Sequence, residues 1–386
     1  PRSTQSRSSA ASDVYKRQAG GQGTRLGYDG PKGAFAISPV RGASLFQLLA
    51  EALLGAERRY GFPVRWYVMT SPLNHAATIE FFRSHRHFGL SADQLMFFQQ
   101  RQMPAFLPDG RIALAEPHRV ALGPDGHGGS LWALRDSGAL ADMRVRGIEY
   151  ISYFQVDNPL VKPIDPLFIG LHILTESEMS SKAVAKVDDL ERVGNFCLAD
   201  GRLTVIEYSD LPEELARARN PDGSRRFDAG SIAIHIVSRD FVERLTAPGA
   251  SLSLPWHRAD KKLAVFDPKT GDTGPTVRDV VKLEMFVFDA IPLASRPLVL
   301  YTQRAEEFSP VKNATGVDSA ETARRDLIRR AAAWLRSCGC HVPVDAAGEP
   351  AAPLEISPAY AVDAADLRER LTELPEVVAG RPLLLA

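Results

Sequence analysis

The sequence predicts an α/β protein with a mostly parallel, doubly wound sheet and a small C-terminal domain. Three observations support this fold class. Apolar, strand-like runs alternate with helical patterns over residues 19–310. The strongest of these runs, residues 148–156 (IEYISYFQV), is followed by an acidic residue, as in open α/β sheets that bind ligands at their carboxyl edge. The chain has 386 residues, 45% of them hydrophobic, so it can bury a sizeable core.

The individual elements follow from local patterns, taken in chain order. Ser44 can cap a helix whose leucines recur at helical spacing as far as residue 59. Residues 66–70 (WYVMT) form a short apolar run typical of a buried parallel strand. A helix over 74–85 and a strand over 95–98 follow. The remaining strands are expected at 148–156, 182–187, 203–208, 231–237 and 298–302, and the last long helix at 320–336.

Composition excludes several classes of protein. Lys plus Arg total 46 against 47 for Asp plus Glu, a net charge of −1, which argues against binding nucleic acid or a membrane surface by bulk charge. No apolar run is long enough for a transmembrane helix. Three cysteines make neither a disulfide framework nor a zinc site. We therefore expect a cytoplasmic protein with no nucleic-acid or membrane partner; its oligomeric state carries no sequence signal.

Residues 1–18 (PRSTQSRSSAASDVYKRQ) differ from the rest of the chain. They are polar, rich in serine and without periodicity. We interpret them as a non-native segment that resembles translated sequencing adapter. A glycine-rich loop begins at Ala19, and the buried strand expected before such a loop is missing from the pattern. A missing central strand predicts unpaired sheet edges and a cavity.

The densest chemical signal is residues 19–27 (AGGQGTRLG), followed by residues 30–33 (GPKG). Glycines let backbone N–H groups approach a phosphate or a base, and Arg25 and Lys32 add charges suited to a polyphosphate. The loop is neither a P-loop nor a Gly-x-Gly-x-x-Gly motif. Its alternative interpretation is a glycine-rich surface turn.

These motifs resemble the nucleotide-binding loop of the UDP-sugar pyrophosphorylase family, and most closely its UDP-N-acetylglucosamine pyrophosphorylase branch. Further matching strings occur in the same order over about residues 19–358: FFQQ, PDGHGG, VDN, IEYSD, FDAGSIAIH, VKLEMFVFD, EFSPVKNA and EISP. The resemblance implies a Rossmann-like (GT-A-like) nucleotidyltransferase domain over residues 19–317 and a small C-terminal domain over 318–386. It implies transfer of uridylyl from UTP to a sugar 1-phosphate, with Mg²⁺ as cofactor.

The resemblance also implies site residues. Catalytic positions are Arg25, Lys32 and Lys312. UTP-binding positions are Ala19, Gly20, Gly21, Lys32, Gln100, Gly126, Asp157 and Lys282, with Asp157 also holding the metal. Sugar-phosphate-binding positions are His127, Glu207, Tyr208, Ser231 and Lys312.

The residue types suit this chemistry independently of the resemblance. Attack of a phosphate oxygen on the α-phosphorus of a nucleoside triphosphate requires in-line positioning and cations, and no protein nucleophile. Taken singly, each residue has an ordinary alternative: Asp157 can cap the turn before Pro159, and Lys282 or Lys312 can lie on a solvated surface. The colinear set of motifs favours the functional interpretation.

The sequence does not decide which sugar 1-phosphate is the substrate. The N-acetylglucosamine branch usually has asparagine where this chain has His127 and Ser231. A Gly-His-Gly string is similar to UDP-glucose and broad-specificity pyrophosphorylases. Overall similarity favours N-acetylglucosamine 1-phosphate, whereas these two positions favour glucose 1-phosphate or a relaxed preference. A non-catalytic UDP-sugar-binding protein on the same fold is the alternative from another class.

Overall fold

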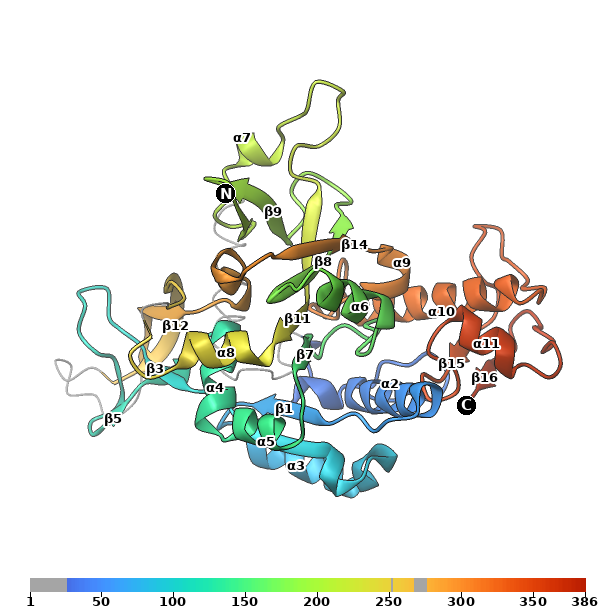
Figure 1. Cartoon of the computed structure of the whole chain (residues 1–386), viewed down its shortest axis with the longest axis horizontal. Coiled ribbons are helices and arrows are strands. Elements are labelled where there is room, and N and C mark those ends of the chain that lie inside the picture. Colours follow the sequence, from blue (N-terminus) through green and yellow to red (C-terminus); the bar gives the residue numbers. More distant parts are fainter. Residues whose placement is uncertain (1–25, 251–252, 267–275) are drawn as a thin grey trace.

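The computed structural model describes residues 26–250, 253–266 and 276–386 (Figure 1). The predicted glycine-rich loop residues Ala19, Gly20, Gly21 and Arg25, and the segment 1–18, lie outside these ranges. The described α-helices are α2 (Leu45–Tyr60), α3 (His75–Ser84), α4 (Ser130–Asp136), α5 (Ala139–Val145), α6 (Pro166–Leu174), α7 (Glu213–Ala216), α8 (Arg239–Thr246), α9 (Arg304–Glu307), α10 (Ala320–Ser337) and α11 (Ala364–Arg370). Short 3₁₀ turns include η2 (Lys32–Ala34), η5 (His127–Gly129) and η6 (Val287–Leu293).

The strands form one large sheet and several two-stranded sheets. The large sheet has the order β10-β9-β11-β8-β14, with β7 paired to β11. Its strands are β7 (Tyr150–Tyr153), β8 (Met179–Ala185), β9 (Gly194–Ala199), β10 (Arg202–Ile206), β11 (Ala229–Ser238) and β14 (Leu298–Tyr301). The pairs are β1 (Trp66–Thr70) with β2 (Leu95–Gln99), β3 (Gln102–Pro104) with β6 (Leu122–Pro124), β4 (Leu114–Glu116) with β5 (Arg119–Val120), β12 (His257–Val265) with β13 (Thr276–Glu284), and β15 (Leu354–Ile356) with β16 (Leu383–Leu385).

The prediction of a mostly parallel sheet is wrong for the described strands. Strand β11 runs antiparallel to β7, β8 and β9, and β9 forms an antiparallel pair with β10. Only the β14–β8 pairing of the large sheet is parallel. For β9 and β10 the reason is the connection: a two-residue turn joins them, and a parallel neighbour would need a long crossover. The sheet is therefore mixed, with an antiparallel centre.

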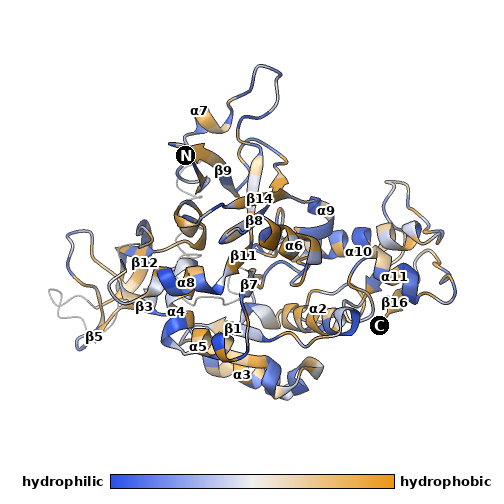
Figure 2. Cartoon of the chain, viewed as in Figure 1, coloured by the Kyte–Doolittle hydropathy of each residue, from blue (hydrophilic) through white to orange (hydrophobic). Residues whose placement is uncertain are grey.

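Helix α2 shows how the local sequence fixes an element beside the site. The Ser44 hydroxyl accepts a hydrogen bond from the Gln47 backbone N–H, and Gly61 ends the helix with a φ of 81°. Of its buried leucines, Leu49 packs with residues of the large sheet and Leu53 with residues of β1 and β2. By contrast, the sequence of α6 (PLFIGLHIL) holds no Asp, Glu, Lys or Arg, and Figure 2 shows this helix as mostly hydrophobic.

Helix α10, strands β15 and β16 and helix α11 share an apolar cluster of their own at the C-terminal end of the chain. Polar contacts join this part to α2: the Glu355 carboxylate accepts hydrogen bonds from the backbone of Val40 and Arg41, and Ser357 donates to Glu51 at 2.7 Å. The start of α10, however, packs in another cluster with Ile37. The boundary at residue 317 therefore stays a prediction. None of the described helices is long and apolar enough to cross a membrane.

Two strand edges face each other beside the site. Among the described residues, β1 pairs only with β2, and β7 pairs only with β11. Residues of β1 and β7 line a common cavity of about 450 Å³, which we call cavity A. Its walls between these strands are largely apolar and include Trp66, Phe98 and Ile151.

Two histidines are buried around the large sheet. The His172 ring lies 2.8 Å from the Ser180 hydroxyl and 3.1 Å from that of Ser238, and the His235 ring lies 2.8 Å from the Ser181 hydroxyl. Burial lowers the pKa of His172 to about 4 and that of His235 to about 3. Both imidazoles are therefore neutral in the folded protein near pH 7.

We predict that acidification destabilises the fold through these two side chains. Their pKa is about 6.5 in the unfolded chain, so the unfolded state takes up their protons first as the pH falls. The stabilisation is complete above that value and is lost as the pH falls toward 4, by about 2 kcal/mol per histidine at pH 5. Thermal unfolding at pH 7.5 and pH 5 should show a clear fall in Tm. The His172→Gln variant should lose less on acidification; an equal loss would contradict the prediction.

Candidate functional site

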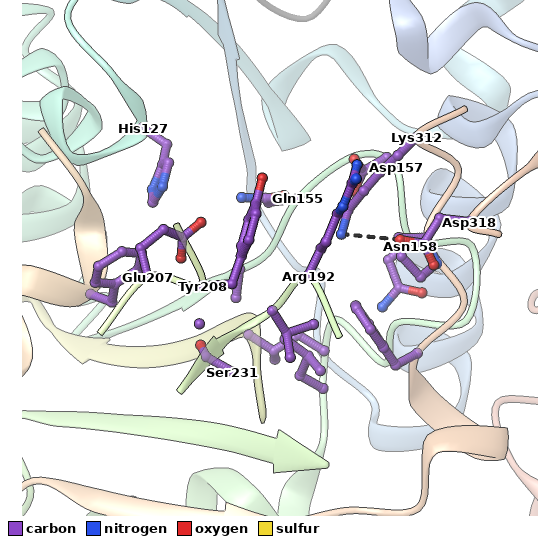
Figure 3. A pocket seen from close by; sticks show the side chains of 18 of the residues that line it. His127, Gln155, Asp157, Asn158, Arg192, Glu207, Tyr208, Ser231, Lys312 and Asp318 are labelled. Carbon is purple, nitrogen blue, oxygen red and sulfur yellow. Dashed lines mark ion pairs between the residues drawn. The ribbon is translucent and has the colours of Figure 1, made fainter. Parts of the chain in front are cut away.

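Two cavities meet at the carboxyl end of β7. Cavity A extends from η2 and β1 to the loop that contains Gly126. The second, cavity B, has a volume of about 280 Å³ and lies between β9, β11 and the loop after α9 (Figure 3). His127, Gln155 and Asp157 line both cavities. A ligand that fills both must therefore pass these three residues.

Asp157 is the charged centre of the junction. Lys32 donates a hydrogen bond to its carboxylate at 2.8 Å, and this pair joins η2 to the end of β7. Burial alone would raise the pKa of Asp157, but Lys32 and Lys312 outweigh it and hold that pKa below its usual value. The carboxylate is therefore ionised at neutral pH and faces both cavities.

The loop that carries Lys312 is fixed to the Asp157 turn by backbone contacts. The Val311 N–H donates to the Asp157 carbonyl at 2.8 Å. The Asn158 amide donates to the Glu307 carbonyl at 2.6 Å and accepts from the Ser309 N–H at 3.1 Å. These bonds hold the turn and the loop at a fixed separation. Asn158 belongs to the VDN motif of the sequence, but no sequence pattern indicates this positioning role.

Gln100 closes one end of cavity A. Its backbone N–H donates to the Thr70 carbonyl at 2.7 Å, and its side-chain amide donates to the Gly126 carbonyl at 2.7 Å. The amide orientation is thereby set, and the side-chain oxygen remains as an acceptor. Gly126 has a φ of 87°, a conformation that favours glycine. Burial raises the pKa of the neighbouring Asp125 to about 6.

His127 stands at the junction with a fixed tautomer. Its Nδ1 accepts a hydrogen bond from the Val287 N–H at 3.2 Å, so Nε2 carries the proton. The ring stacks on Phe286, with centroids 5.1 Å apart. Phe286 stacks in turn on His257, which pairs with Asp289 at 2.7 Å. Burial, together with His257, lowers the pKa of His127 to about 4, which leaves a neutral N–H donor.

The opposite wall of cavity B comes from the large sheet. Ser231 is buried on β11, where the pairing with β8 shifts register before His235. Ala233 within this bulge has a φ of 54°, a strained value for a residue with a side chain. Glu207 and Tyr208 follow β10; burial, with help from Asp210, raises the pKa of Glu207. The wall therefore offers hydroxyl and carboxyl groups to a polar ligand.

The structure brings together most of the described site residues predicted from the sequence. Cavity A is lined by Lys32, Gln100, Gly126, His127 and Asp157, and cavity B by His127, Asp157, Glu207, Tyr208, Ser231 and Lys312. Lys282 lines neither: its amine lies beside Gly123, and burial lowers its pKa. Cavity B also contains Arg192 and Asp318, which sequence reasoning missed because no local motif marks them.

The donor set at the junction suits a small, hard cation. No group of three or more His, Cys, Asp or Glu side chains in the described residues could hold a metal by itself. Mg²⁺ needs only one or two carboxylates when phosphate oxygens and water complete its shell. The ionised Asp157 carboxylate, open to both cavities, fits a magnesium ion that arrives with a phosphate ligand.

Comparison with known proteins gives a consistent result. The sequence model of the UTP–glucose-1-phosphate uridylyltransferase family matches residues 14–327. The chain is 39% identical over 360 residues to UDP-N-acetylhexosamine pyrophosphorylase-like protein 1 of Homo sapiens, covering 88% of this chain and 71% of that protein. It is 37% identical over 359 residues to UDP-N-acetylglucosamine diphosphorylase 2 of Arabidopsis thaliana, covering 87% and 69%. Its fold is similar to that of the uridine diphosphate N-acetylglucosamine pyrophosphorylase from Trypanosoma brucei, crystallised with an inhibitor, with a TM-score of 0.78 and 27% identity over 98% of this chain and 80% of that one.

Proposed function

Because the chain belongs to the UTP–glucose-1-phosphate uridylyltransferase family, we propose that it transfers the uridylyl group of UTP to a sugar 1-phosphate. The products are a UDP-sugar and pyrophosphate. The observation that carries this proposal is the pair of cavities that share Asp157, with Lys32 in cavity A and Lys312 in cavity B. Each substrate then has its own cavity and its own lysine, and the reacting phosphates meet at the shared carboxylate.

The reaction needs no protein nucleophile. An oxygen of the sugar phosphate attacks the α-phosphorus of UTP, and the bond from that phosphorus to the oxygen of the β-phosphate breaks as pyrophosphate leaves. Lys32 and Lys312 neutralise the charge that the two phosphates bring together. The Asn158 bonds keep Lys312 at its distance from Asp157 while the substrates exchange.

The orientation of the Gln100 side-chain amide favours uracil as the base of the bound nucleotide. One N–H of its amide donates to the Gly126 carbonyl, and its side chain also hydrogen-bonds to Asp125, which leaves the side-chain oxygen for a ligand. An acceptor at this position pairs with the N3–H of uracil, whereas cytosine presents an unprotonated nitrogen there. Cytosine would leave two acceptors facing each other, so UTP should be preferred over CTP.

Asp157 is the residue that would hold Mg²⁺. The ion would supply charge neutralisation at the α-phosphate when bound. Lys32, at 2.8 Å from the same carboxylate, would exchange this partner for the triphosphate. The carboxylate and the amine are thus held close to each other before either binds its ligand.

For the sugar, we favour N-acetylglucosamine 1-phosphate. The similarity to the diphosphorylase of Arabidopsis thaliana over 87% of this chain supports this choice. His127 and Ser231, which depart from that branch, support glucose 1-phosphate or a broad preference as the alternative. Both residues line cavity B, where the sugar would lie.

The test is pyrophosphate release from UTP with Mg²⁺, measured in parallel with N-acetylglucosamine 1-phosphate and glucose 1-phosphate. CTP in place of UTP is the control for the base. We expect release with UTP and at least one of the two sugars, and much slower release with CTP. A folded protein that binds UTP yet releases no pyrophosphate with either sugar would overturn the proposal.

The His127→Asn variant should shift the sugar preference. An asparagine offers both a donor and an acceptor to an acetamido group, whereas the fixed imidazole offers only its Nε2–H. We expect the ratio of kcat/KM for N-acetylglucosamine 1-phosphate over glucose 1-phosphate to rise by about tenfold. An unchanged ratio would remove His127 from the specificity argument.

A further inference from the structure

Arg192 is the only arginine among the described residues that line cavity B. It lies in the loop between β8 and β9, two residues before β9 begins. Figure 3 shows its side chain extending from this wall toward the side of the cavity where Asp157 and Lys312 lie. Within the described ranges, its guanidinium has neither a hydrogen bond nor an ion pair. An unpaired guanidinium in a cavity is a ready ligand for an anion.

The acidic neighbours of Arg192 in the loop are already engaged elsewhere. Glu191 pairs with Arg304 at 2.7 Å and accepts from the Val187 N–H at 2.8 Å. Asp189 pairs with Arg219 and Arg225. Asp188, the third carboxylate of the loop, accepts from the Leu190 N–H at 2.8 Å, and none of the three carboxylates is paired with Arg192 in the described residues.

One of these contacts also connects the chain segments that carry Arg192 and Lys312. Arg304 is the first residue of α9, and the loop with Lys312 follows that helix. The Glu191–Arg304 pair therefore joins the segment of Arg192 to the segment of Lys312. The two cations come from different walls of cavity B but are held by connected backbone.

We propose that Arg192, opposite Lys312, binds the phosphate group of the sugar 1-phosphate. This inference rests on the proposed function and adds a residue to it. A phosphate monoester brings close to two negative charges. Lys312 is the only lysine among the described lining residues of cavity B, and it is already paired with Asp318 at 3.5 Å, so these residues without Arg192 leave most of that charge uncompensated. Arg192 supplies the second cation and two parallel N–H donors that match phosphate oxygens.

The position of Arg192 indicates that it binds the phosphate of the sugar and not the phosphates of the nucleotide. Arg192 and Lys312 line cavity B and not cavity A, whereas Lys32 and Gln100 line cavity A and not cavity B. Substitution of Arg192 should therefore weaken binding of the sugar phosphate and leave binding of UTP unchanged.

The experiment compares Arg192→Ala and Arg192→Lys with Arg202→Ala, an exposed arginine of β10 that lines neither cavity. With N-acetylglucosamine 1-phosphate and UTP, Arg192→Ala should raise the KM of the sugar phosphate by about tenfold or more and leave the KM of UTP within about twofold. Arg192→Lys should give an intermediate KM for the sugar phosphate, because lysine keeps the positive charge but lacks the two parallel N–H donors of a guanidinium. The control should match the unsubstituted protein.

Calorimetry of N-acetylglucosamine 1-phosphate and of free N-acetylglucosamine separates this inference from the proposed function. Arg192→Ala should lose affinity only for the phosphorylated sugar. Equal affinity of variant and unsubstituted protein for the phosphorylated sugar would overturn the inference, as would an equal rise in the KM of both substrates. If the unsubstituted protein releases no pyrophosphate, the proposed function fails, while calorimetry still decides the role of Arg192.

Discussion

The Asp157→Asn variant is expected to lose on the order of 10³-fold in kcat while it still folds. Asparagine keeps the shape of the side chain but removes the charge that Lys32 and Lys312 stabilise and that Mg²⁺ requires. We expect UTP to bind weakly and only at high Mg²⁺. Steady-state kcat at saturating substrates and calorimetric titration of UTP at low and high Mg²⁺ measure the two effects.

A matched control is Asp318→Asn. Asp318 also lines cavity B and pairs with Lys312, but at 3.5 Å, and it is absent from the lining of cavity A. Its substitution should cost less than about tenfold in kcat. Turnover of Asp157→Asn equal to that of the unsubstituted protein would eliminate the proposed metal-binding role of Asp157.

The Gly126→Ala variant is expected to raise the KM of UTP by roughly tenfold. A Cβ at this position would lie 2.3 Å from the carbonyl oxygen of Met285, and the φ of 87° disfavours any side chain. The loop must therefore move, and the Gly126 carbonyl that fixes the Gln100 amide moves with it. The KM of UTP and the UTP:CTP ratio of kcat/KM measure this displacement.

Gly138 provides the control for backbone strain alone. It has a φ of 81°, close to that of Gly126, but a Cβ there would meet no atom within 4 Å. Gly138→Ala should cost about 1 kcal/mol of stability and leave the KM of UTP unchanged. If both variants behave alike, steric displacement of the Gly126 loop is not the cause.

Local sequence predicted strands near β1, β8, β10, β11 and β14, but it did not predict β9, β12 or β13. The directions of the strands could not be predicted either. WYVMT forms β1 over Trp66–Thr70, as its apolar run indicates. In the run IEYISYFQV only Tyr150–Tyr153 pairs with a neighbour among the described residues, and the residues that follow line the cavities. Apolar alternation reports which residues are buried. It does not report which edge of β8 the long strand β11 pairs with, or in which sense.

The family and several site residues were accessible through the order of the motifs. That identification is confirmed by the family match over residues 14–327. Lys32 and Asp157 are 125 positions apart, and their ion pair exists only once η2 and β7 are packed together. Arg192 could not be predicted, since its role depends on what its neighbours bind and not on a motif. For Lys282 the opposite holds. A sequence motif marks this residue, but its burial beside Gly123 could not be predicted from the sequence.

The residues shared by the two cavities have a consequence for the kinetics. A UDP-sugar would occupy both cavities at once, so it excludes UTP and the sugar phosphate alike. Pyrophosphate would bind in cavity A, where the triphosphate lay, and so would leave cavity B open to a second sugar phosphate. Inhibition by the nucleotide-sugar product should therefore be competitive against both substrates, and the enzyme should slow as that product accumulates. In this way the geometry around Asp157 would couple the rate of synthesis to demand for the nucleotide sugar.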